Sequence, residues 1–378
     1  MKKRILALDM GGTSVKAGLF YRDEEEKETS WEHNYRDCGL KKAKADLITR
    51  IKKFSTCKVD AVGLSVAGLI ATDNSLYRST VLTSFTGFNI PEFLRQELGV
   101  EVVTIDNDAD CGAMGEWHNC RKRFFYVVVG SGIGSAYINY DGRLPYLTRL
   151  DPKHKFSDKD NPIPNDLGLQ VALPKTYIYK KFKEFCDVDK EKIDKVLKDK
   201  NGKPLRGPNN SPNSIRVGKL GSATGLKNII DILLFGQDFD TEDYYQNQIS
   251  RYLPKGIKIN LKDFSNEKKI AKMLSLFAHH GEPIAQQAFK LFGHFLGYGI
   301  AKATKVIRSQ QRIYDTLEVR LSGQIMGSAD LFEKETRLVV CEGGGNCHLK
   351  LASSPYKTNL QGAYLRAAES LKKKGEEK

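Results

Sequence analysis

The chain contains two pairs of short apolar segments, each joined by a glycine-rich turn, and this repetition restricts its fold more than any other feature. Ile5–Leu8 and Val15–Phe20 flank the first turn, whereas Phe124–Val129 and Ser135–Tyr140 flank the second. Short apolar runs on both sides of turn residues are typical of β-hairpins. Because the unit occurs twice, far apart in the chain, we expect two related lobes, each built on one hairpin.

Alternating strand and helix patterns follow the first hairpin. Branched apolar runs that end at glycine or asparagine predict strands, and longer amphipathic runs predict helices. In chain order the predicted elements are a strand near Trp31–Tyr35, a helix over Leu40–Phe54, a strand over Val59–Val66, a helix over Pro91–Leu98, a strand over Val102–Ile105 and a helix over Ala109–Trp117. This order predicts a mixed sheet with helices packed against it, which is an α/β fold.

The C-terminal part has an equally clear pattern. Pro283–Ile307 keeps one face apolar along its length and predicts a long helix. Leu317–Leu321 and Leu338–Cys341 are short apolar runs that we interpret as strands, and Gln361–Lys372 predicts a terminal helix. Residues 150–265 are rich in Lys, Asp, Asn and Pro and show no comparable periodicity.

Composition indicates a globular protein of the cytoplasm. The 378 residues are 40% hydrophobic, and no apolar run approaches the ~20 residues that span a bilayer. The basic start followed by a short apolar stretch has no cleavage site and contains Asp9, so we expect a first strand there instead of a signal peptide. Seven scattered cysteines without a Cys-x-x-Cys pair predict neither a disulfide framework nor a structural zinc site.

The net charge of +14 attracts anions in general, including nucleic acid, membranes and phosphorylated molecules. The lysines are spread along predicted helices and loops and alternate with acidic residues, and no aromatic-interleaved basic strip accompanies them. We therefore expect a solvated basic surface, with neither nucleic acid nor membrane as a partner.

The first glycine turn is a candidate phosphate site. Gly11, Gly12 and Thr13 follow a strand directly, so backbone N–H groups and a hydroxyl can approach a phosphate closely. Asp9, at the strand end, can hold a hydrated Mg²⁺. Taken alone, the same turn is equally typical of an ordinary hairpin.

A second candidate is the acidic segment between the strand at Val102–Ile105 and the following helix. Asn107 and Asp108 lie at the carboxyl end of that strand, where open sheets commonly place ligands. A carboxylate at this point can accept a proton from a substrate hydroxyl. The alternative is a helix N-cap, a role for which Asn and Asp are well suited.

Two further glycine turns complete the set. Gly130, Ser131, Gly132 and Gly134 lie in the turn of the second hairpin and have the pattern of a phosphate-binding turn. Gly323 lies where a predicted strand passes into a helix, a place that can accommodate an adenosine.

Taken in order, these segments resemble the ROK family of repressors and kinases, a branch of the hexokinase–actin superfamily. The resemblance is clearest over residues 5–145, weaker over residues 283–370 and absent from the middle of the chain. The stretches that carry it are LALDMGGTSVKAGL, AVGLSVAGLIA, TIDNDADCGAMGE, VVGSGIGSAYINYDGRL, FLGYGIAKAT, LSGQIMG and LQGAYLRAA.

The resemblance implies an α/β fold of two ribonuclease-H-like lobes, of the actin/hexokinase type, with an interlobe cleft. It places the N-terminal lobe at residues 1–124, with the helix at 359–372 packing back on it. The C-terminal lobe then takes residues 125–358, with an atypical insertion around 150–265. A homodimer is compatible with this family.

The resemblance further implies a kinase that transfers the γ-phosphate of ATP, with Mg²⁺, to a hydroxyl of a sugar or polyol. Asp108 would be the general base, and Asn107 and Asp108 would contact the sugar together with Gly87 and Asn89. The implied phosphate, metal and nucleotide residues are Asp9, Gly11, Gly12, Thr13, Lys16, Gly130, Ser131, Gly132, Gly134, Gly323 and Gln324.

The chain departs from the family in its middle segment. Many ROK sugar kinases have a Gly-Glu-x-Gly-His motif and a cysteine-rich zinc loop, whereas the nearest stretch here is Asn165–Leu169, without histidine or following cysteines. Asp166 is the candidate to replace the glutamate as a sugar ligand. The chain is also similar to polyphosphate glucokinases, which lack the zinc loop, so polyphosphate is an alternative donor.

Other functions on the same fold remain open. A non-catalytic nucleotide or sugar sensor would retain the fold without turnover, and an ATPase or phosphatase would use water as the acceptor. ROK repressors carry a helix-turn-helix before the first glycine strand; because only four residues precede that strand here, we expect no such domain.

Overall fold

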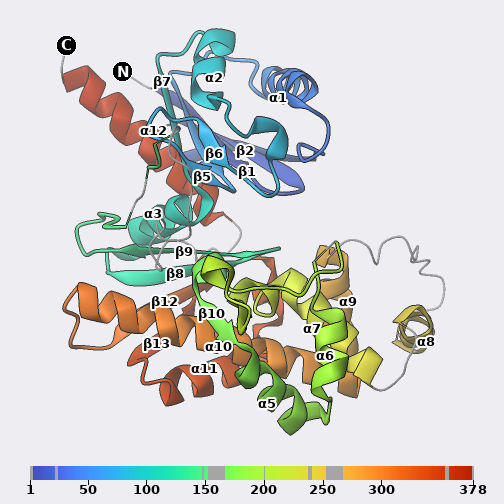
Figure 1. Cartoon of the computed structure of the whole chain (residues 1–378). Coiled ribbons are helices and arrows are strands. Elements are labelled where there is room, and N and C mark those ends of the chain that lie inside the picture. Colours follow the sequence, from blue (N-terminus) through green and yellow to red (C-terminus); the bar gives the residue numbers. More distant parts are fainter. Residues whose placement is uncertain are drawn as a thin grey trace. The chain divides into compact units, whose positions relative to one another are not determined.

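The structure is a computed structural model of the whole chain (Figure 1). It describes residues 3–21, 24–146, 149–151, 167–199, 201–236, 241–252, 267–353 and 357–376. The chain forms two compact units. The first comprises Met1–Tyr126, Ala136–Phe156 and Ala352–Lys378, and the second comprises Val127–Ser135 and Ser157–Leu351.

A five-stranded sheet organises the first unit, with the order β3-β2-β1-β4-β7. Its strands are β1 (Arg4–Met10), β2 (Ser14–Tyr21), β3 (Glu24–Glu32), β4 (Ala61–Val66) and β7 (Val102–Asn107). The first three strands form an antiparallel meander, and β4 and β7 run parallel to β1. The carboxyl ends of β1, β4 and β7 therefore lie at one edge of the sheet.

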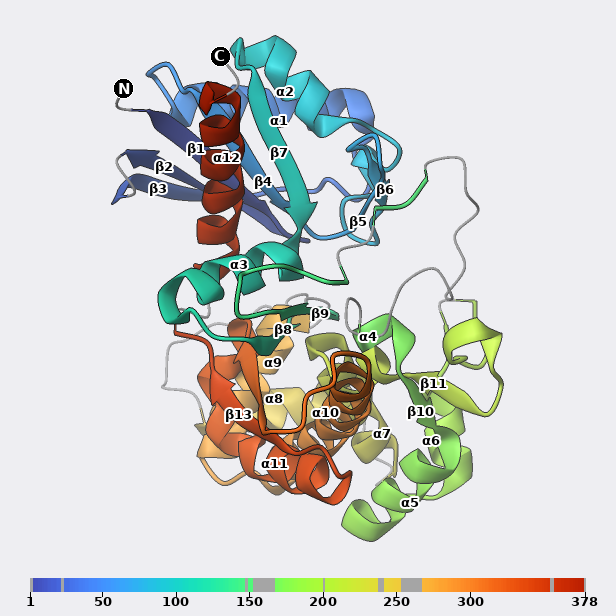
Figure 2. The ribbon, with the colours of Figure 1, turned by 90° about the vertical axis from the view of Figure 1, so that its left-hand side faces the viewer.

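Helices cover both faces of this sheet, because the parallel strands carry apolar side chains on alternate sides (Figure 2). Leu6 and Leu8 of β1 share a core with α1 (Leu40–Phe54) and α2 (Ile90–Leu98). Ile5 and Ala7 point the other way and share a core with α12 (Thr358–Glu376). Helix α3 (Asp108–Cys120) packs against α12 on that second face.

Short elements connect β4 to α2. Strands β5 (Leu69–Ile70) and β6 (Leu76–Arg78) pair antiparallel, and the 3-10 turn η1 (Thr83–Phe85) follows. The segment after β9 returns to this region, because Leu150 forms a parallel bridge with Ala71.

The second unit contains a four-stranded sheet of order β13-β12-β8-β9. Its strands are β8 (Phe124–Val129), β9 (Ile133–Ile138), β12 (Leu317–Ser322) and β13 (Cys347–Leu351), and β8 and β9 cross the boundary between the units. The helices are α4 (Leu167–Gln170), α5 (Lys175–Cys186), α6 (Lys190–Val196), α7 (Ala223–Gly236), α8 (Thr241–Tyr252), α9 (Glu267–His279), α10 (Pro283–Gln310) and α11 (Glu333–Glu342). Smaller elements are the ladder of β10 (Ala172–Pro174) with β11 (Ser214–Arg216), and the 3-10 turns η3 (Pro208–Asn210), η4 (Val217–Lys219) and η6 (Gln324–Leu331).

Helix α10 is the core of this unit. It begins at Pro283, and the side chain of Glu282 caps it by accepting a hydrogen bond from the Ala285 N–H. Most of its apolar side chains are buried against α5, α7, α9 and α11.

The sequence predicted most of these elements. The α/β class, both hairpins, α1, α10 and α12 are confirmed, with shifts of a few residues at the ends. The strand predicted near Trp31–Tyr35 is wrong in position, since β3 spans Glu24–Glu32. Five glutamates occupy this exposed edge strand, so it lacks the apolar alternation that marks buried strands.

The strand predicted at Leu338–Cys341 is also wrong. These residues lie in α11, and the strand that pairs with β12 is β13. A run of four apolar residues has the same appearance in a buried strand and on the inner face of a helix, so the pattern alone cannot separate them.

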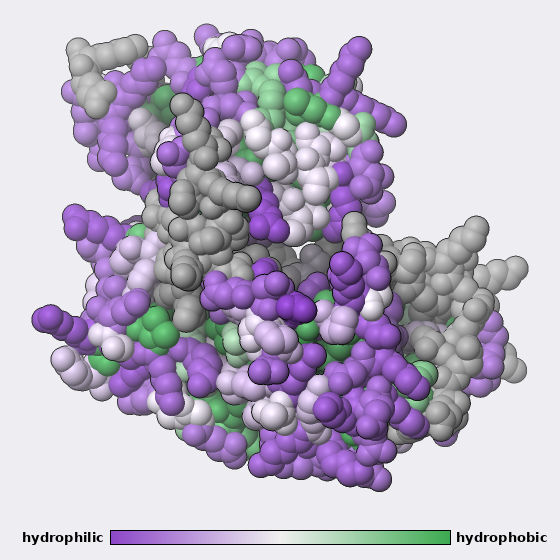
Figure 3. All heavy atoms as spheres, in the orientation of Figure 1, coloured by the Kyte–Doolittle hydropathy of each residue, from purple (hydrophilic) through white to green (hydrophobic). Residues whose placement is uncertain are grey.

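Hydrophilic side chains cover much of each unit on the face drawn in Figure 3. Over the residues that the structure describes, no helix combines the length and apolar character needed to cross a bilayer.

Candidate functional site

Three polar side chains stand side by side where the parallel strands of the first unit end. Asp9 of β1 is in register with Ser65 of β4, and Ser65 is in register with Asp106 of β7. All three side chains are on the face of the sheet that α3 and α12 cover. Ala7, two residues before Asp9 on β1, is on the same face. The strand pattern thus gathers polar groups at the carboxyl edge of the sheet, a common place for ligands.

Asp9 is held in place from two elements. Ser65 Oγ donates a hydrogen bond to Asp9 Oδ1 at 2.8 Å, and Asn359 Nδ2 of α12 lies 3.5 Å from the same oxygen. Lys16 is directly opposite Asp9 in the β1–β2 ladder, so both side chains occur on the same face of the sheet.

The first glycine turn follows Asp9 directly. The Gly11 N–H donates to the Ser14 carbonyl at 3.0 Å and closes the turn. At Gly12 a Cβ atom would lie 3.1 Å from the Val81 side chain, so little room exists there for a larger residue. Thr13 is exposed. Phosphate binding at this turn stays a prediction.

His33, directly after β3, holds this turn, and nothing in the sequence pattern identified it. Its Nδ1 accepts the Tyr35 N–H at 3.1 Å, so the proton is on Nε2, which donates to the Gly11 carbonyl at 3.0 Å. The ring stacks on Tyr35, whose hydroxyl donates to Asp46 of α1.

Asn107 and Asp108 divide the two roles that the sequence left open. Asn107 is the N-cap of α3: its Oδ1 accepts the Ala109 N–H at 2.9 Å, and its Nδ2 donates to the Gly68 carbonyl at 2.9 Å. Asp108 Oδ1 also accepts from Ala109. Burial of the Asp108 carboxyl and the nearby negative charge of Asp9 raise its pKa to about 7.

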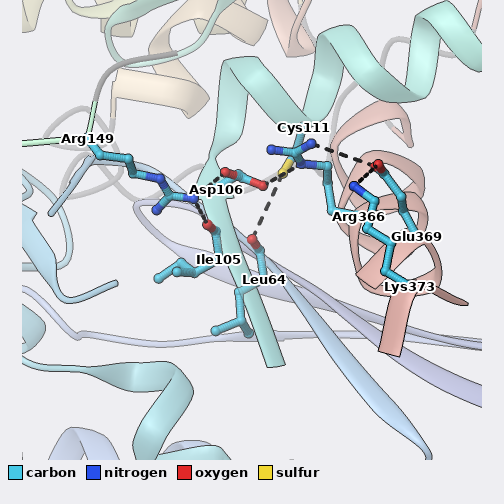
Figure 4. Close-up of polar contacts among 8 residues, drawn as sticks. All are labelled: Leu64, Ile105, Asp106, Cys111, Arg149, Arg366, Glu369 and Lys373. Atoms are coloured by element: carbon cyan, nitrogen blue, oxygen red, sulfur yellow. Dashed lines mark hydrogen bonds and ion pairs between the residues drawn. The ribbon is translucent and has the colours of Figure 1, made fainter. Parts of the chain in front are cut away.

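Asp106 is at the centre of an ion-pair cluster behind this junction (Figure 4). Arg149 Nη2 donates to Asp106 Oδ1 at 2.6 Å, and Arg366 Nε of α12 donates to Asp106 Oδ2 at 2.8 Å. Asp110 is buried next to the cluster. Burial and the charge of Asp106 raise the pKa of Asp110 to about 8, against the opposing effect of the two arginines.

The candidate sugar residues Gly87 and Asn89 lie in the loop before α2. Gly87 has a positive φ of 77°, and its N–H donates to the Leu76 carbonyl at 2.7 Å. Asn89 caps α2 by accepting the Glu92 N–H, and its Nδ2 donates to the Asp73 carbonyl. The amide of Asn89 thus has a structural role, and its contact with a sugar stays a prediction.

The remaining glycine candidates converge in the second unit. The Gly130 carbonyl accepts the Ala223 N–H at 2.9 Å, and Thr224 Oγ1 donates to the Ser131 carbonyl at 2.7 Å. These contacts bind the turn of the second hairpin to the start of α7. A Cβ atom at Gly132 would have no neighbour within 4 Å, so the tip of the turn is open to a ligand.

Gly323 lies beside the base of the same turn. It has a φ of 108°, and a Cβ atom there would lie 2.1 Å from the Val129 carbonyl oxygen, so only glycine fits. Gln324 begins η6 directly after it. Gly134, the last candidate of the turn, lies within β9.

The predicted residues therefore form two groups, one in each unit. Asp9, the first glycine turn, Asn107 and Asp108 gather in the first unit, and the second hairpin turn and Gly323 gather in the second. Asp166 lies outside the described residues. Within the described ranges, no group of three or more His, Cys, Asp or Glu side chains is arranged to hold a metal ion.

Comparison with known proteins gives a consistent result. Residues 5–144 match the sequence pattern of the ROK family. The β-glucoside kinase of Klebsiella pneumoniae is 25% identical over 138 residues, which cover 35% of this chain and 45% of that enzyme. The matched stretch thus spans less than half of that relative's length.

Solved ROK structures share the fold over nearly the whole chain. A glucokinase from Streptomyces griseus, in complex with glucose and AMPPNP, has a TM-score of 0.65 at 15% identity, covering 97% of this chain and 99% of that one. A transcriptional regulator described as a homologue of E. coli Mlc has a TM-score of 0.61 at 14% identity, covering 97% and 78%.

The polyphosphate/ATP-glucomannokinase of Arthrobacter sp. strain KM has a TM-score of 0.52 at 12% identity, covering 97% of this chain and 99% of that one. The fold is thus similar both to ROK sugar kinases and to a polyphosphate-dependent sugar kinase, the two groups that the sequence resembled. The chain matches the ROK family in sequence over residues 5–144 and has the two-lobe α/β fold of ROK proteins.

Proposed function

We propose that this chain is a carbohydrate kinase that transfers the γ-phosphate of ATP to a hydroxyl of a sugar or polyol, with Asp108 as the general base. The observation that carries the proposal is the position of Asp108 at the start of α3, directly after β7 and close enough to Asp9 for the charge of Asp9 to raise its pKa. The family match over these same residues supports it.

Asp108 has the properties that a base for this reaction needs. A pKa near 7 makes its carboxylate a better proton acceptor than an ordinary aspartate, while a large fraction stays ionised at neutral pH. As the substrate oxygen bonds to the γ-phosphorus and the bond to ADP breaks, Asp108 takes the hydroxyl proton. Asn107 fixes the junction through its two hydrogen bonds and so orients the neighbouring carboxylate.

We assign phosphate binding to the glycine turns of both units. In the first unit the Gly11 N–H closes the turn, so the groups that we assign to phosphate are the backbone N–H groups of Gly12 and Thr13 and the Thr13 hydroxyl. In the second unit the Gly130 N–H donates to the Gly132 carbonyl, so the assigned groups are those of Ser131 and Gly132. Adenosine binding is assigned to Gly323 and Gln324, which follow β12 beside that turn.

The residues at Asp9 fit Mg²⁺. Mg²⁺ in kinases is commonly held by one or two carboxylates together with water and substrate phosphates, and Asp9 and Asp108 are close enough for the charge of one to affect the pKa of the other. When bound, Mg²⁺ supplies charge neutralisation on the phosphoryl oxygens. Asp9, fixed by Ser65, is the residue to hold it.

Polyphosphate is the alternative donor. The net charge of +14 favours a polyanionic substrate, and the fold is shared with an enzyme named for both donors. A sensor without turnover is the other alternative, since a transcriptional regulator also has this fold.

The test is a phosphoryl-transfer screen with purified protein, Mg²⁺, either ATP or polyphosphate, and a panel of sugars and polyols, with the phosphorylated product measured by mass spectrometry. We expect transfer to at least one sugar. Asp108→Asn should lower kcat at least ~100-fold, the range for losing a general base, with nucleotide affinity little changed.

Asp110→Asn is the matched control, because it makes the same substitution two positions along α3. Its kcat should stay within about tenfold of the original. Near-normal turnover of the Asp108 variant would remove the assigned role, and sugar binding without transfer from either donor would favour the sensor.

A further inference from the structure

Arg149 is a partly buried arginine that the sequence did not single out. It lies after β9 on a segment that pairs with β5, where the Leu150 N–H donates to the Ile70 carbonyl and the Thr72 N–H donates to the Leu150 carbonyl. These bonds fix the backbone beside Arg149 against the segment that begins at Gly68.

The side chain of Arg149 reaches from this segment to the end of β7 (Figure 4). Its Nη2 donates to the Ile105 carbonyl at 2.7 Å and to Asp106 Oδ1 at 2.6 Å. One nitrogen thus binds both the backbone and the side chain of the two residues directly before Asn107. Asp106 is 3% exposed, so this charged hydrogen bond is shielded from water and is stronger than a surface pair.

The same segment also holds the junction from the opposite side. Asn107 Nδ2 donates to the Gly68 carbonyl, and β5 begins directly after Gly68. The last three residues of β7, which directly precede Asp108, are therefore bonded to Arg149 and to Gly68. The Arg149 side chain connects residues 149–151 to the end of β7.

We infer that Arg149 is a positioning residue, which holds the end of β7 so that Asp108 keeps the orientation that proton transfer requires. The inference rests on the proposed function for its catalytic consequence. Its structural part is independent of that function, because Arg149 bonds to the end of β7 whether or not a reaction takes place.

Arg366 provides the internal comparison. It donates to the other oxygen of Asp106 from α12, and the hydrogen bonds among the described residues include none from Arg366 to the β7 backbone. After loss of Arg366, Arg149 would still hold both Ile105 and Asp106. Arg143 is a second control on the same post-β9 segment, since it is an exposed arginine paired only with Asp141 among the described contacts.

The experiment compares Arg149→Met, Arg149→Lys, Arg366→Met and Arg143→Met in the full chain. Hydrogen exchange is followed over residues 104–112, which include the Ala109 amide bonded to Asn107 and Asp108. We expect faster exchange there in Arg149→Met, partial recovery in Arg149→Lys, and little change in the other two variants.

Where the screen finds a substrate, kcat of Arg149→Met should fall about tenfold to 100-fold, with KM for the donor within about twofold, because a small displacement of the base has effects of this size. Unchanged exchange at the junction, an equal effect of Arg366→Met, or normal kcat despite faster exchange would each overturn the inference. If no donor and sugar react, the proposed function fails, and the exchange comparison alone decides whether Arg149 holds the junction.

Discussion

Asp106, Asp108 and Asp110 lie within five consecutive residues but have three different environments. Asp106 is paired with two arginines, Asp108 is near Asp9, and Asp110 is buried and forms no ion pair among the described residues. Asp106 is in β7, whereas Asp108 and Asp110 are in the first turn of α3, so their side chains have different surroundings. Identical side chains can therefore serve as a structural clamp, a base and a buried acid.

The pKa of Asp108 predicts the pH dependence of the reaction. The folded value of about 7 lies above the ordinary value of 3.8, so the base form becomes the major form only above about pH 7. We expect kcat/KM to rise close to tenfold per pH unit below pH 7 and to level off above it. The measurement is a pH profile at constant ionic strength. Residual activity of Asp108→Asn should lack this limb, and persistence of the limb would assign it to another group.

Asp110 predicts an effect on stability. Its pKa of about 8 is raised from 3.8, so its contribution to stability is fully present below about pH 4 and is lost as pH rises through 8. Asp110→Asn cannot ionise and should gain Tm relative to the original chain as pH rises from 5 to 9. Each kcal/mol gained corresponds to a few degrees, roughly 2–4 °C.

Thermal unfolding at both pH values measures this gain. Asp106→Asn is the contrasting variant, because it leaves two partly buried arginines without their carboxylate and should lose Tm at both pH values. A loss of Tm in Asp110→Asn at pH 9 would mean that the Asp110 carboxylate is ionised and paired.

Helix α12 lies very close to α3. Cβ atoms at Gly362 of α12 and Gly115 of α3 would lie 1.8 Å and 2.1 Å from backbone carbonyl oxygens of the other helix. On the sheet, a Cβ atom at Gly63 of β4 would lie 2.0 Å from the Ala363 carbonyl oxygen. Glycine at these three places lets the helix approach close enough for Asn359 and Arg366 to reach Asp9 and Asp106.

Gly362→Ala should therefore destabilise the first unit by about 1–3 kcal/mol, as overpacking does. Chemical denaturation measures this loss. Gly375→Ala on the same helix is the control, since its nearest neighbour would be the Lys3 Nζ at 4.0 Å. There the better helix propensity of alanine should leave stability unchanged or raise it by up to ~1 kcal/mol. Equal effects of the two substitutions would contradict the close-contact interpretation.

The whole molecule carries a net charge of +14, and the structure gives many of its cations acidic partners. In α5, for example, Lys180, Lys181 and Lys183 pair with Glu184, Asp187 or Asp189. Because these lysines alternate with acidic partners, they do not form a continuous basic strip. We therefore expect the protein to attract anions in general and to have no dedicated nucleic-acid site.

We accordingly expect weak binding of duplex DNA that falls steeply between 50 and 200 mM salt, because nonspecific binding depends on counterion release. Fluorescence anisotropy with labelled duplexes of unrelated sequence measures it. Binding to one sequence that survives physiological salt and an excess of competitor DNA would show a specific nucleic-acid function instead.

Local pattern was enough to predict both glycine hairpins, the boundaries of α1, the long helix α10 and the strand-to-helix junction that carries Asn107 and Asp108. These features depend on the periodicity and turn preferences of neighbouring residues, which a sequence displays directly. The choice of Asp9 and Asp108 as candidates followed from their places at strand ends and from the family resemblance.

Tertiary structure decided what depends on distant parts of the chain. Arg149 and Arg366 meet Asp106 across 43 and 260 positions, and no local pattern contains that information. His33 reaches the first glycine turn because the meander brings the end of β3 beside it. Packing likewise made Leu338–Cys341 part of a helix, and the burial around Asp108 and Asp110 raised their pKa values, because burial is set by the folded surroundings of a residue and not by its neighbours in sequence.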